Sequence, residues 1–317
     1  MPTEEQVREF LEKAGWGGAV GEPLAGDASI RKYVRLRHGR QSAVLMDASQ
    51  VPETIAPFAR IDRHLLQLGF SAPAIMALDE AGGLLLLEDF GDANFSRLLE
   101  RGDKPEKLLA LATDVLIALH QHPAAVPNGL RAYDPDAMLA DVELFLEWRT
   151  PAISKEGATE FRKVWREVLP VAHQVPASLL LRDYHAANLM LLAGREGVRQ
   201  AGLLDFQDAY RGPVTYDLVS LLEDARRDFP ADLRGKMVAR YRSRFPALDR
   251  KAFDTSLAIL AALRHARVLA IFERLSRRDG RHDYKKLHSP RVEHLLQQAL
   301  RHPQLAGLKR WMEQYAR

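Results

Sequence analysis

The chain has 317 residues, of which 47% are hydrophobic and 27% are charged, a composition typical of folded globular proteins. Its length allows one or two domains. The 45 basic residues exceed the 42 acidic ones by three, which gives a net charge of +3. Because the sequence has no dense basic block with interleaved aromatic residues, we expect no nucleic-acid partner.

Cysteine is absent, which excludes thiol nucleophiles, thiolate zinc sites and disulfides. The first fifteen residues form a charged helical pattern without the apolar core of a signal peptide. No apolar run approaches the ~20 residues that span a bilayer. We therefore expect a soluble cytoplasmic protein that binds no membrane and is a monomer or weak dimer.

The first ninety residues predict a small α+β unit. Apolar spacing indicates helices over residues 3–14 and 55–68. Strands are expected over residues 30–37, 41–47, 74–78 and 83–87, with turn residues between them. The last strand breaks into the polar segment 88–92, which suits either a hinge between two lobes or an ordinary strand-to-helix turn.

Beyond residue 92 the pattern becomes mainly helical. Helices are expected over residues 95–99, 107–120, 136–148 and 159–174, and again from 216 to the end. Residues 178–206 differ, because two or three short strands surround a polar loop there. The order predicts an α+β fold with a small β-rich lobe, residues 1–89, and a larger helical lobe, residues 90–317.

The polar loop carries the strongest chemical signal. Asp183, His185 and Asn188 form a D-x-H-x-x-N motif between apolar runs, and Asp205 follows the next strand. From Asn188 to Asp205 the chain advances 205 − 188 = 17 residues, enough for a strand, a hairpin at residues 194–197 and a return strand. Asn188 and Asp205 should therefore lie side by side. A single Asp or Asn in a loop usually caps the backbone, but the combined pattern favours a functional site.

Phosphoryl transfer requires such a set of residues. A carboxylate accepts the proton of the attacking hydroxyl, and Mg²⁺ bridges the outer phosphates of ATP. Magnesium is held by few protein oxygens, typically one or two carboxylates with water and phosphate. Asp183 is placed for the first role, and Asn188 and Asp205 for the second. Transfer would be direct, without a covalent enzyme intermediate.

The same residues carry a resemblance to the aminoglycoside phosphotransferase and choline kinase families, which have a protein-kinase-like two-lobed fold. Within them the chain looks most similar to the bacterial anomeric kinases for N-acetylmuramate and N-acetylglucosamine in cell-wall recycling. Besides the loop, the resemblance rests on Gly26-Asp27-Ala28-Ser29, Leu86-Leu87-Glu88-Asp89-Phe90-Gly91-Asp92, Asp205-Phe206-Gln207-Asp208-Ala209, Gly212-Pro213-Val214-Thr215-Tyr216-Asp217-Leu218 and Ile271-Phe272-Glu273-Arg274-Leu275. It implies ATP-dependent phosphorylation of the anomeric hydroxyl of an N-acetylated amino sugar.

The resemblance also implies that residues 1–89 are a nucleotide-binding lobe and residues 90–317 a catalytic and substrate lobe, and it assigns nucleotide-binding residues. Adenine is expected to bond to hinge backbone near Glu88, Asp89 and Phe90. Kinases of this fold usually carry a phosphate-gripping lysine on the third strand, but the matching stretch here is Ala43-Val44-Leu45-Met46-Asp47. Arg31 or Lys32, after the turn that ends at Ser29, could supply the charge, or could be ordinary exposed strand residues.

Three residues around the loop have alternative roles. His185 could move protons, but bracing of Asp205 or of the loop backbone is favoured. Asp217 could brace the catalytic loop or simply cap the helix that follows. Leu181 stands where many relatives have a bracing histidine, and we expect activity to survive that change.

The sugar site is the least defined part. Residues 256–274 form a helix that is apolar nearly all round and therefore buried, yet it contains Arg264, His265 and Arg267. Buried charge needs a partner, which is either a substrate carboxylate, such as the lactyl group of N-acetylmuramate, or an internal Asp or Glu, the alternative we favour. Glu143 and Trp148 could line a sugar pocket, although core packing explains Trp148 equally well.

Two rival functions remain open. One is a kinase for another small molecule, such as an aminoglycoside or a choline-like alcohol; the basic helix argues against a polycationic substrate. The other is a nucleotide-binding pseudokinase, which the missing lysine supports. The intact set of Asp183, Asn188 and Asp205 argues against it, because a binding module needs no base.

Overall fold

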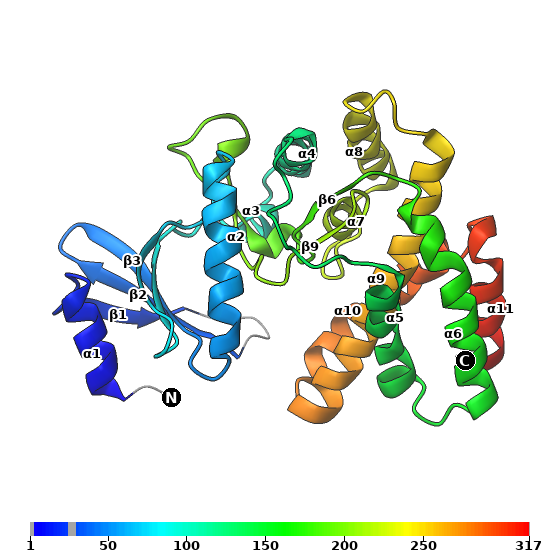
Figure 1. Ribbon diagram of the computed structural model, residues 1–317, viewed down its shortest axis with the longest axis horizontal. Coiled ribbons are helices and arrows are strands. Elements are labelled where there is room, and N and C mark those ends of the chain that lie inside the picture. Colours follow the sequence, from blue (N-terminus) through cyan, green and yellow to red (C-terminus); the bar gives the residue numbers. More distant parts are fainter. Residues whose placement is uncertain (1–2, 25–29, 317) are drawn as a thin grey trace. The chain divides into compact units, whose positions relative to one another are not determined.

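The computed structural model describes residues 3–24 and 30–316. The chain divides into two compact units, shown in Figure 1. The first unit runs up to Asp103 and also includes Ala187–Ala209; the second consists of Lys104–Ala186 and the chain from Tyr210 onward. The second unit is therefore interrupted by a segment that packs with the first.

The first unit is built on an antiparallel five-stranded sheet with the order β1-β2-β3-β5-β4. Its strands are β1 (Val20–Pro23), β2 (Lys32–His38), β3 (Gln41–Asp47), β4 (Ile75–Asp79) and β5 (Leu84–Glu88). Buried Leu45 pairs with Val34 on β2 and with Leu86 on β5, which fixes the register of the three central strands. Strands β2 to β5 match the expected ones within two residues, whereas β1 was not predicted.

Two helices accompany this sheet. Helix α1 (Glu4–Lys13) begins with a reciprocal cap between Thr3 and Gln6 and packs Phe10 against Leu45 and Leu86. Helix α2 (Ile55–Gln67), preceded by the short turn η1 (Pro52–Thr54), lies beside the sheet in Figure 1. Both helices were expected from their apolar spacing.

The hairpin β7 (Leu189–Leu191) and β8 (Ala201–Leu203), with the turn η5 (Gly197–Gln200), belongs to the first unit. Backbone hydrogen bonds attach it there: the Leu203 N–H donates to the Ser71 carbonyl at 2.7 Å. The Leu191 N–H donates to the Ala93 carbonyl, just before α3 (Phe95–Glu100), also at 2.7 Å. This hairpin carries Asn188 and Asp205 at its ends, so both belong to the first unit.

The second unit is mainly helical. Its elements are α4 (Pro105–Gln121), α5 (Pro135–Leu144), the π-turn η2 (Phe145–Arg149), α6 (Lys155–Val168), η3 (Leu169–His173), α7 (Tyr216–Leu222), α8 (Ala231–Ser243), α9 (Arg250–Asp279), α10 (His282–Ala299), η6 (Pro303–Leu305) and α11 (Ala306–Tyr315). The core joins aromatic side chains such as Phe161 and Trp311, 4.6 Å apart between ring centroids, to buried aliphatic residues of α9.

Helix α9 is the central helix of the second unit. It begins at an Asp249 side-chain cap and ends where Gly280 adopts φ 66°, a left-handed conformation that glycine takes without strain. By length and composition it could cross a membrane, which differs from the expectation that no run would, but 78% of its apolar window is buried inside the structure. That burial is the property of a core helix.

A two-stranded sheet of β6 (Ala177–Leu180) and β9 (Tyr210–Pro213) completes the second unit. The sequence predicted β6 but not β9, and it placed β6 in one group with the β7–β8 hairpin. In the structure the chain leaves the second unit near the turn η4 (Ala186–Asn188) and returns at β9. The assignment of nucleotide binding to residues 1–89, and of catalysis and substrate binding to residues 90–317, stays a prediction. The two compact units have bounds that differ from these ranges.

Candidate active site

The loop that carries Asp183 follows strand β6 and is held by buried backbone contacts within the second unit. The Asp217 carboxylate accepts hydrogen bonds from the N–H groups of Leu181 at 2.6 Å and Arg182 at 2.9 Å. The hydroxyl of Ser220 donates to the Arg182 carbonyl at 3.1 Å. Asp217 therefore braces the loop, as one of the two alternatives expected, and does not cap its own helix.

Arg182, directly before Asp183, has φ 64°, which is rare for a residue other than glycine. Its guanidinium pairs with Asp141 and lies 5.0 Å from the ring centroids of both Tyr133 and Tyr210. The Tyr133 hydroxyl donates to the same Asp141 carboxylate at 2.6 Å. Backbone and side-chain contacts together hold a strained conformation that sets the direction of the next residue.

Positive charge dominates the surroundings of Asp183. Burial raises the pKa of its carboxyl group, but the nearby positive charges, that of Arg267 first and those of Arg182 and Arg264 with it, outweigh burial and lower the pKa below its ordinary value. Asp183 is half-buried, so it is not sealed from a reactant. The carboxylate is consequently ionised at neutral pH and able to accept a proton.

His185 is buried, with 7% of its surface exposed. Burial lowers the pKa of its imidazole, more strongly than the nearby Asp224 and Asp183 raise it, so the neutral ring is favoured. Its Nδ1 atom has no hydrogen-bond partner among residues 3–24 and 30–316. A neutral buried ring suits the positioning role that the sequence favoured over proton transfer.

Asn188 and Asp205 lie side by side at the ends of the β7–β8 hairpin, as predicted. The Asn188 amide Nδ2 is 3.4 Å from the Asp205 Oδ2 atom. The other carboxylate oxygen, Oδ1, is 2.9 Å from Nε2 of Gln207 and 3.5 Å from Nη1 of Arg31. Next to Asp205, the buried Phe206 ring stacks on Phe58 of α2 at 5.1 Å and anchors the turn.

The chemistry of this pair fits a magnesium ion. One carboxylate and one amide provide hard oxygen ligands side by side, which is the small protein contribution that Mg²⁺ commonly accepts. Asp205 has φ 59°, a conformation that Asp tolerates better than most residues. In the part of the chain that the structure describes, no group of three or more His, Asp or Glu residues is arranged to hold a metal ion.

The expected nucleotide-binding residues occupy different environments. Ser29 lies outside the described residues. Lys32 is exposed at the start of β2, whereas the Arg31 side chain is only 9% exposed and faces Asp205. On the third strand Met46 is buried, and no lysine takes its place.

The polar segment 88–92, which suited either a hinge or an ordinary turn, is tied to the first unit. The Asp89 side chain is 6% exposed and forms an ion pair with Nε of Arg35 at 2.8 Å; Arg35 also contacts Asp92 at 2.9 Å. Glu88 pairs with Arg195, whose guanidinium also lies 5.2 Å from the Phe90 ring centroid. Any contact of Asp89 with a nucleotide would therefore involve its backbone, because its carboxylate is already bound.

Three basic residues of α9, Arg264, His265 and Arg267, have internal partners; those of His265 and Arg267 are carboxylates, as we favoured, whereas Arg264 donates to a backbone carbonyl. The imidazole of buried His265 contacts Glu223 at 2.6 Å, and Arg264 donates to the Glu223 carbonyl at 3.4 Å. Nε of Arg267 is 3.5 Å from Asp141. The other two proposed sugar contacts are also engaged, because Glu143 pairs with Arg162 and Trp148 packs against the hydrophobic core.

Several residues of this site were missed at the sequence level. Arg182 and Asp141 hold the catalytic loop, and Gln207 holds Asp205. Arg182 is the residue before Asp183 in the motif, and Gln207 lies in the Asp-Phe-Gln motif, so position gave a signal for both. No sequence signal indicated Asp141, because its role depends on which face of its helix contacts the catalytic loop.

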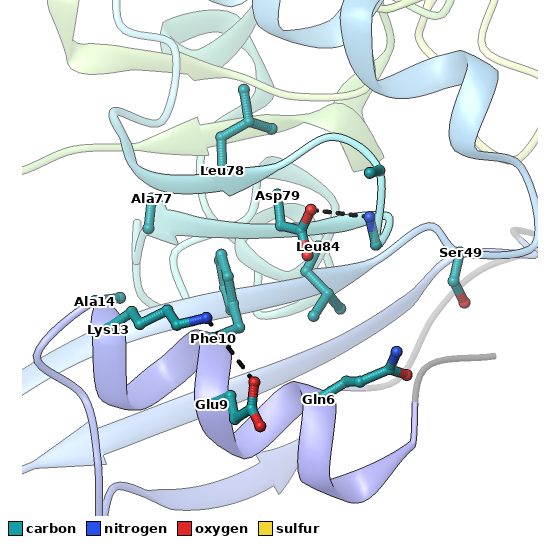
Figure 2. A pocket seen from close by; sticks show the side chains of 12 residues that line it. Gln6, Glu9, Phe10, Lys13, Ala14, Ser49, Ala77, Leu78, Asp79 and Leu84 are labelled. Atoms are coloured by element: carbon teal, nitrogen blue, oxygen red, sulfur yellow. Dashed lines mark hydrogen bonds and ion pairs between the residues drawn. The ribbon is translucent and has the colours of Figure 1, made fainter.

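The first unit also has a hollow of about 730 Å³ that is separate from the candidate active site. Figure 2 shows its walls, formed by α1 residues such as Glu9 and Lys13, by Asp79 of β4, and by Ser49 and Leu84. Lys13 pairs with Glu9 at 3.8 Å, and Asp79 accepts a hydrogen bond from the Gly82 N–H at 2.9 Å. It contains none of the expected site residues, so it adds nothing to phosphoryl transfer.

Comparisons with known proteins agree with this geometry. The phosphotransferase enzyme family (APH) matches residues 20–254. The N-acetylmuramate/N-acetylglucosamine kinase of Caulobacter vibrioides is 35% identical over 96% of this chain and 94% of its own length. The enzyme with the same name from Pseudomonas aeruginosa is 33% identical over 95% of this chain and 90% of its own length.

A solved structure shows the fold. The choline/ethanolamine kinase family protein from Mesorhizobium loti aligns with a TM-score of 0.67 and 16% identity, over 98% of this chain and 99% of its own. The α+β, protein-kinase-like fold expected from the sequence is thereby confirmed. From the family match, the full-length relatives and the shared fold, the chain belongs to the phosphotransferase enzyme family.

Proposed function

We propose that this protein is an ATP-dependent kinase that phosphorylates the anomeric hydroxyl of the free sugars N-acetylmuramate and N-acetylglucosamine, and that it acts in the cytoplasm. The observation that carries the proposal is the half-buried carboxylate of Asp183 on a loop braced by Asp217, among arginines that lower its pKa. The sugar assignment is supported by two relatives of that name, of whose lengths this chain covers 94% and 90%.

In this proposal Asp183 is the general base. Its carboxylate accepts the proton of the anomeric hydroxyl as that oxygen attacks the γ-phosphorus of ATP, and ADP leaves. The bond from the γ-phosphorus to the ADP oxygen breaks while the bond to the sugar oxygen forms. Neutral His185 and the brace from Asp217 serve to position Asp183, and neither needs to change its protonation state.

Asn188 and Asp205 would hold Mg²⁺, which supplies charge neutralisation to the outer phosphates when bound. Arg31 is the better of the two candidates to replace the missing lysine. Its guanidinium already faces Asp205, whereas Lys32 is exposed at the strand start. The backbone from Glu88 to Phe90 remains the proposed contact for adenine.

The charge around the catalytic loop argues against the first rival, a kinase for aminoglycosides or choline-like alcohols. Arg267, Arg182 and Arg264 all act on Asp183. Such an environment disfavours a cationic substrate, because like charges repel at short range. Solved aminoglycoside and choline kinase structures share the fold at low identity, which carries no information on the substrate.

The proposal is tested by measuring ADP release from MgATP with N-acetylmuramate, N-acetylglucosamine, glucose, choline and an aminoglycoside. We expect turnover with the two N-acetylated sugars only, and its loss when Mg²⁺ is removed with a chelator. Turnover confined to another acceptor would contradict the sugar assignment. Tight nucleotide binding without turnover on any acceptor would instead support the pseudokinase alternative.

A further inference from the structure

Helix α9 leaves one half-buried face between its buried residues. Past the buried pair Arg264 and His265, the residues Arg267, Ile271 and Arg274 are half-buried. Their spacing of four and then three residues places them on one side of the helix. Between Arg264 and Ser276 the helix thus presents a narrow half-buried stripe, which also includes Val268, with an arginine at each end.

This stripe begins at the catalytic loop. Arg267 shares the Asp141 carboxylate with Arg182, and its charge is the strongest of those that lower the pKa of Asp183. Arg274 lies seven residues further along α9, which is about 10 Å along the helix axis. All of these residues belong to the second unit, so their arrangement does not depend on the first.

Arg274 differs from the neighbouring arginines of α9 because it has no hydrogen-bond or ion-pair partner among the described residues. Arg277 pairs with Glu273 at 3.4 Å, and Arg278 binds Asp279 through two nitrogens at 2.6 and 3.0 Å. Among residues 3–24 and 30–316, by contrast, Arg274 forms neither a hydrogen bond nor an ion pair, and its buried Nε atom has no acceptor.

The surroundings of Arg274 make the lack of a counter-ion unfavourable. Burial together with the charges of Arg278 and Arg267 lowers the pKa of its guanidinium, while Asp279 and Glu147 offset part of that effect. Asp279 is already bound by Arg278. A half-buried guanidinium without a counter-ion costs free energy, and an arginine fork matches a carboxylate with two parallel hydrogen bonds.

We propose that Arg274 binds the lactyl carboxylate of N-acetylmuramate while Asp183 receives the proton of its anomeric hydroxyl. This inference rests on the proposed function and assigns the part of the substrate that the arginine recognises. N-acetylglucosamine has no carboxylate, so Arg274 is a specificity-determining residue for one of the two sugars. Arg264, His265 and Arg267, the earlier candidates for this contact, already have internal partners.

The test compares steady-state kinetics of wild type and Arg274→Gln with both sugars. For N-acetylmuramate we expect KM to rise about ten- to hundredfold, the range for a lost hydrogen bond to a charged group, while kcat changes less than about twofold. Both constants for N-acetylglucosamine should stay the same. Arg274→Lys keeps the charge but not the fork, so its KM for N-acetylmuramate should be intermediate.

Arg277→Gln is the matched control, because it removes an arginine from the same helix. Glu273, the partner of Arg277, keeps its ion pairs with Arg149 and Lys285 in this variant. It should leave KM unchanged for both sugars. The thermal stability of Arg274→Gln should equal or exceed that of wild type, since the substitution breaks no hydrogen bond or ion pair of the described residues and removes an unpaired charge.

Calorimetric titration with N-acetylmuramate in the absence of ATP distinguishes the proposed role of Arg274 from the proposed kinase function. If wild type phosphorylates both sugars and Arg274→Gln affects them equally or not at all, the role of Arg274 is wrong and the proposed function stands. If wild type binds N-acetylmuramate without phosphorylating it, and Arg274→Gln weakens that binding about tenfold, the proposed function is wrong and the carboxylate site stands. No binding and no turnover would overturn both.

Discussion

At the scale of single residues, the two acids expected to do the chemistry have unusual surroundings. Asp183 follows Arg182 at φ 64°, and Asp205 itself has φ 59°. Such conformations cost free energy and persist only where neighbouring contacts determine them. Asp217 and Ser220 supply those contacts for the loop, and Gln207 and Phe206 supply them for Asp205. Strain at both positions supports a functional interpretation.

The variant Asp183→Asn tests the base directly. The amide has nearly the shape of the carboxylate but cannot accept the proton, so kcat should fall by about 10²–10⁴-fold. The affinity for MgATP should stay within about twofold, because Asn188 and Asp205 are unchanged. ADP release and calorimetric titration measure the two quantities. Turnover within tenfold of wild type would remove Asp183 from the base role.

At the scale of elements, helix α2 contains an acid that the proposed chemistry does not use. Asp62 is fully buried, and neither of its carboxylate oxygens has a hydrogen-bond partner within the described ranges 3–24 and 30–316. Burial, opposed in part by Arg63, raises the pKa of Asp62 to about 7. An unpaired buried carboxylate destabilises the charged form of the folded protein.

The sign of the pH dependence follows from this raised pKa. In the unfolded chain Asp62 titrates near 3.9, so its stabilising contribution is fully present below about pH 4 and is lost as the pH rises to about 7. Asp62→Asn removes that titration. At pH 8 the variant should be more stable than wild type by roughly 1–3 kcal/mol, and at pH 4 it should have no advantage.

Chemical denaturation at pH 4, 6 and 8 measures this difference. Glu5→Gln on α1 is a suitable control, because its side chain is 73% exposed and belongs to the same compact unit. It should show no pH-dependent gain. An advantage of Asp62→Asn that is the same at all three pH values would mean that Asp62 is not the titrating group.

Helix α9 shows how one element serves both core and site. Its buried residues, such as Ile259 and Leu263, belong to the core of the second unit. The stripe from Arg267 to Arg274 stays half-buried. The sequence predicted burial from the nearly continuous apolar pattern, but it could not distinguish which arginines had internal partners, because Asp141 and Glu223 come from other helices.

At the scale of the whole molecule, local patterns predicted most of the secondary structure. Strand β3 coincides with the expected residues 41–47, and the hairpin that brings Asn188 beside Asp205 formed as the spacing indicated. Strands β1 and β9 were missed. Both are four residues long and contain Gly and Pro, which are depleted in strands.

The discontinuous course of the chain could not be predicted. Residues 187–209 belong to the first unit because backbone hydrogen bonds attach the hairpin to Ser71 and Ala93. Backbone groups of this kind are present in every residue, so the side-chain sequence gives no signal for which segments they join. The same limit explains why Asp141 was missed, since its pairing with Arg182 depends on tertiary contacts.

The most direct test of the central claim is the position of the phosphate in the product. We would incubate the enzyme with MgATP and N-acetylmuramate and record phosphorus and proton NMR spectra of the sugar. The proposed kinase predicts a phosphorus signal coupled to the anomeric proton and the loss of the reducing end. A phosphate on the primary hydroxyl, or on any other oxygen of the ring, would contradict the proposal.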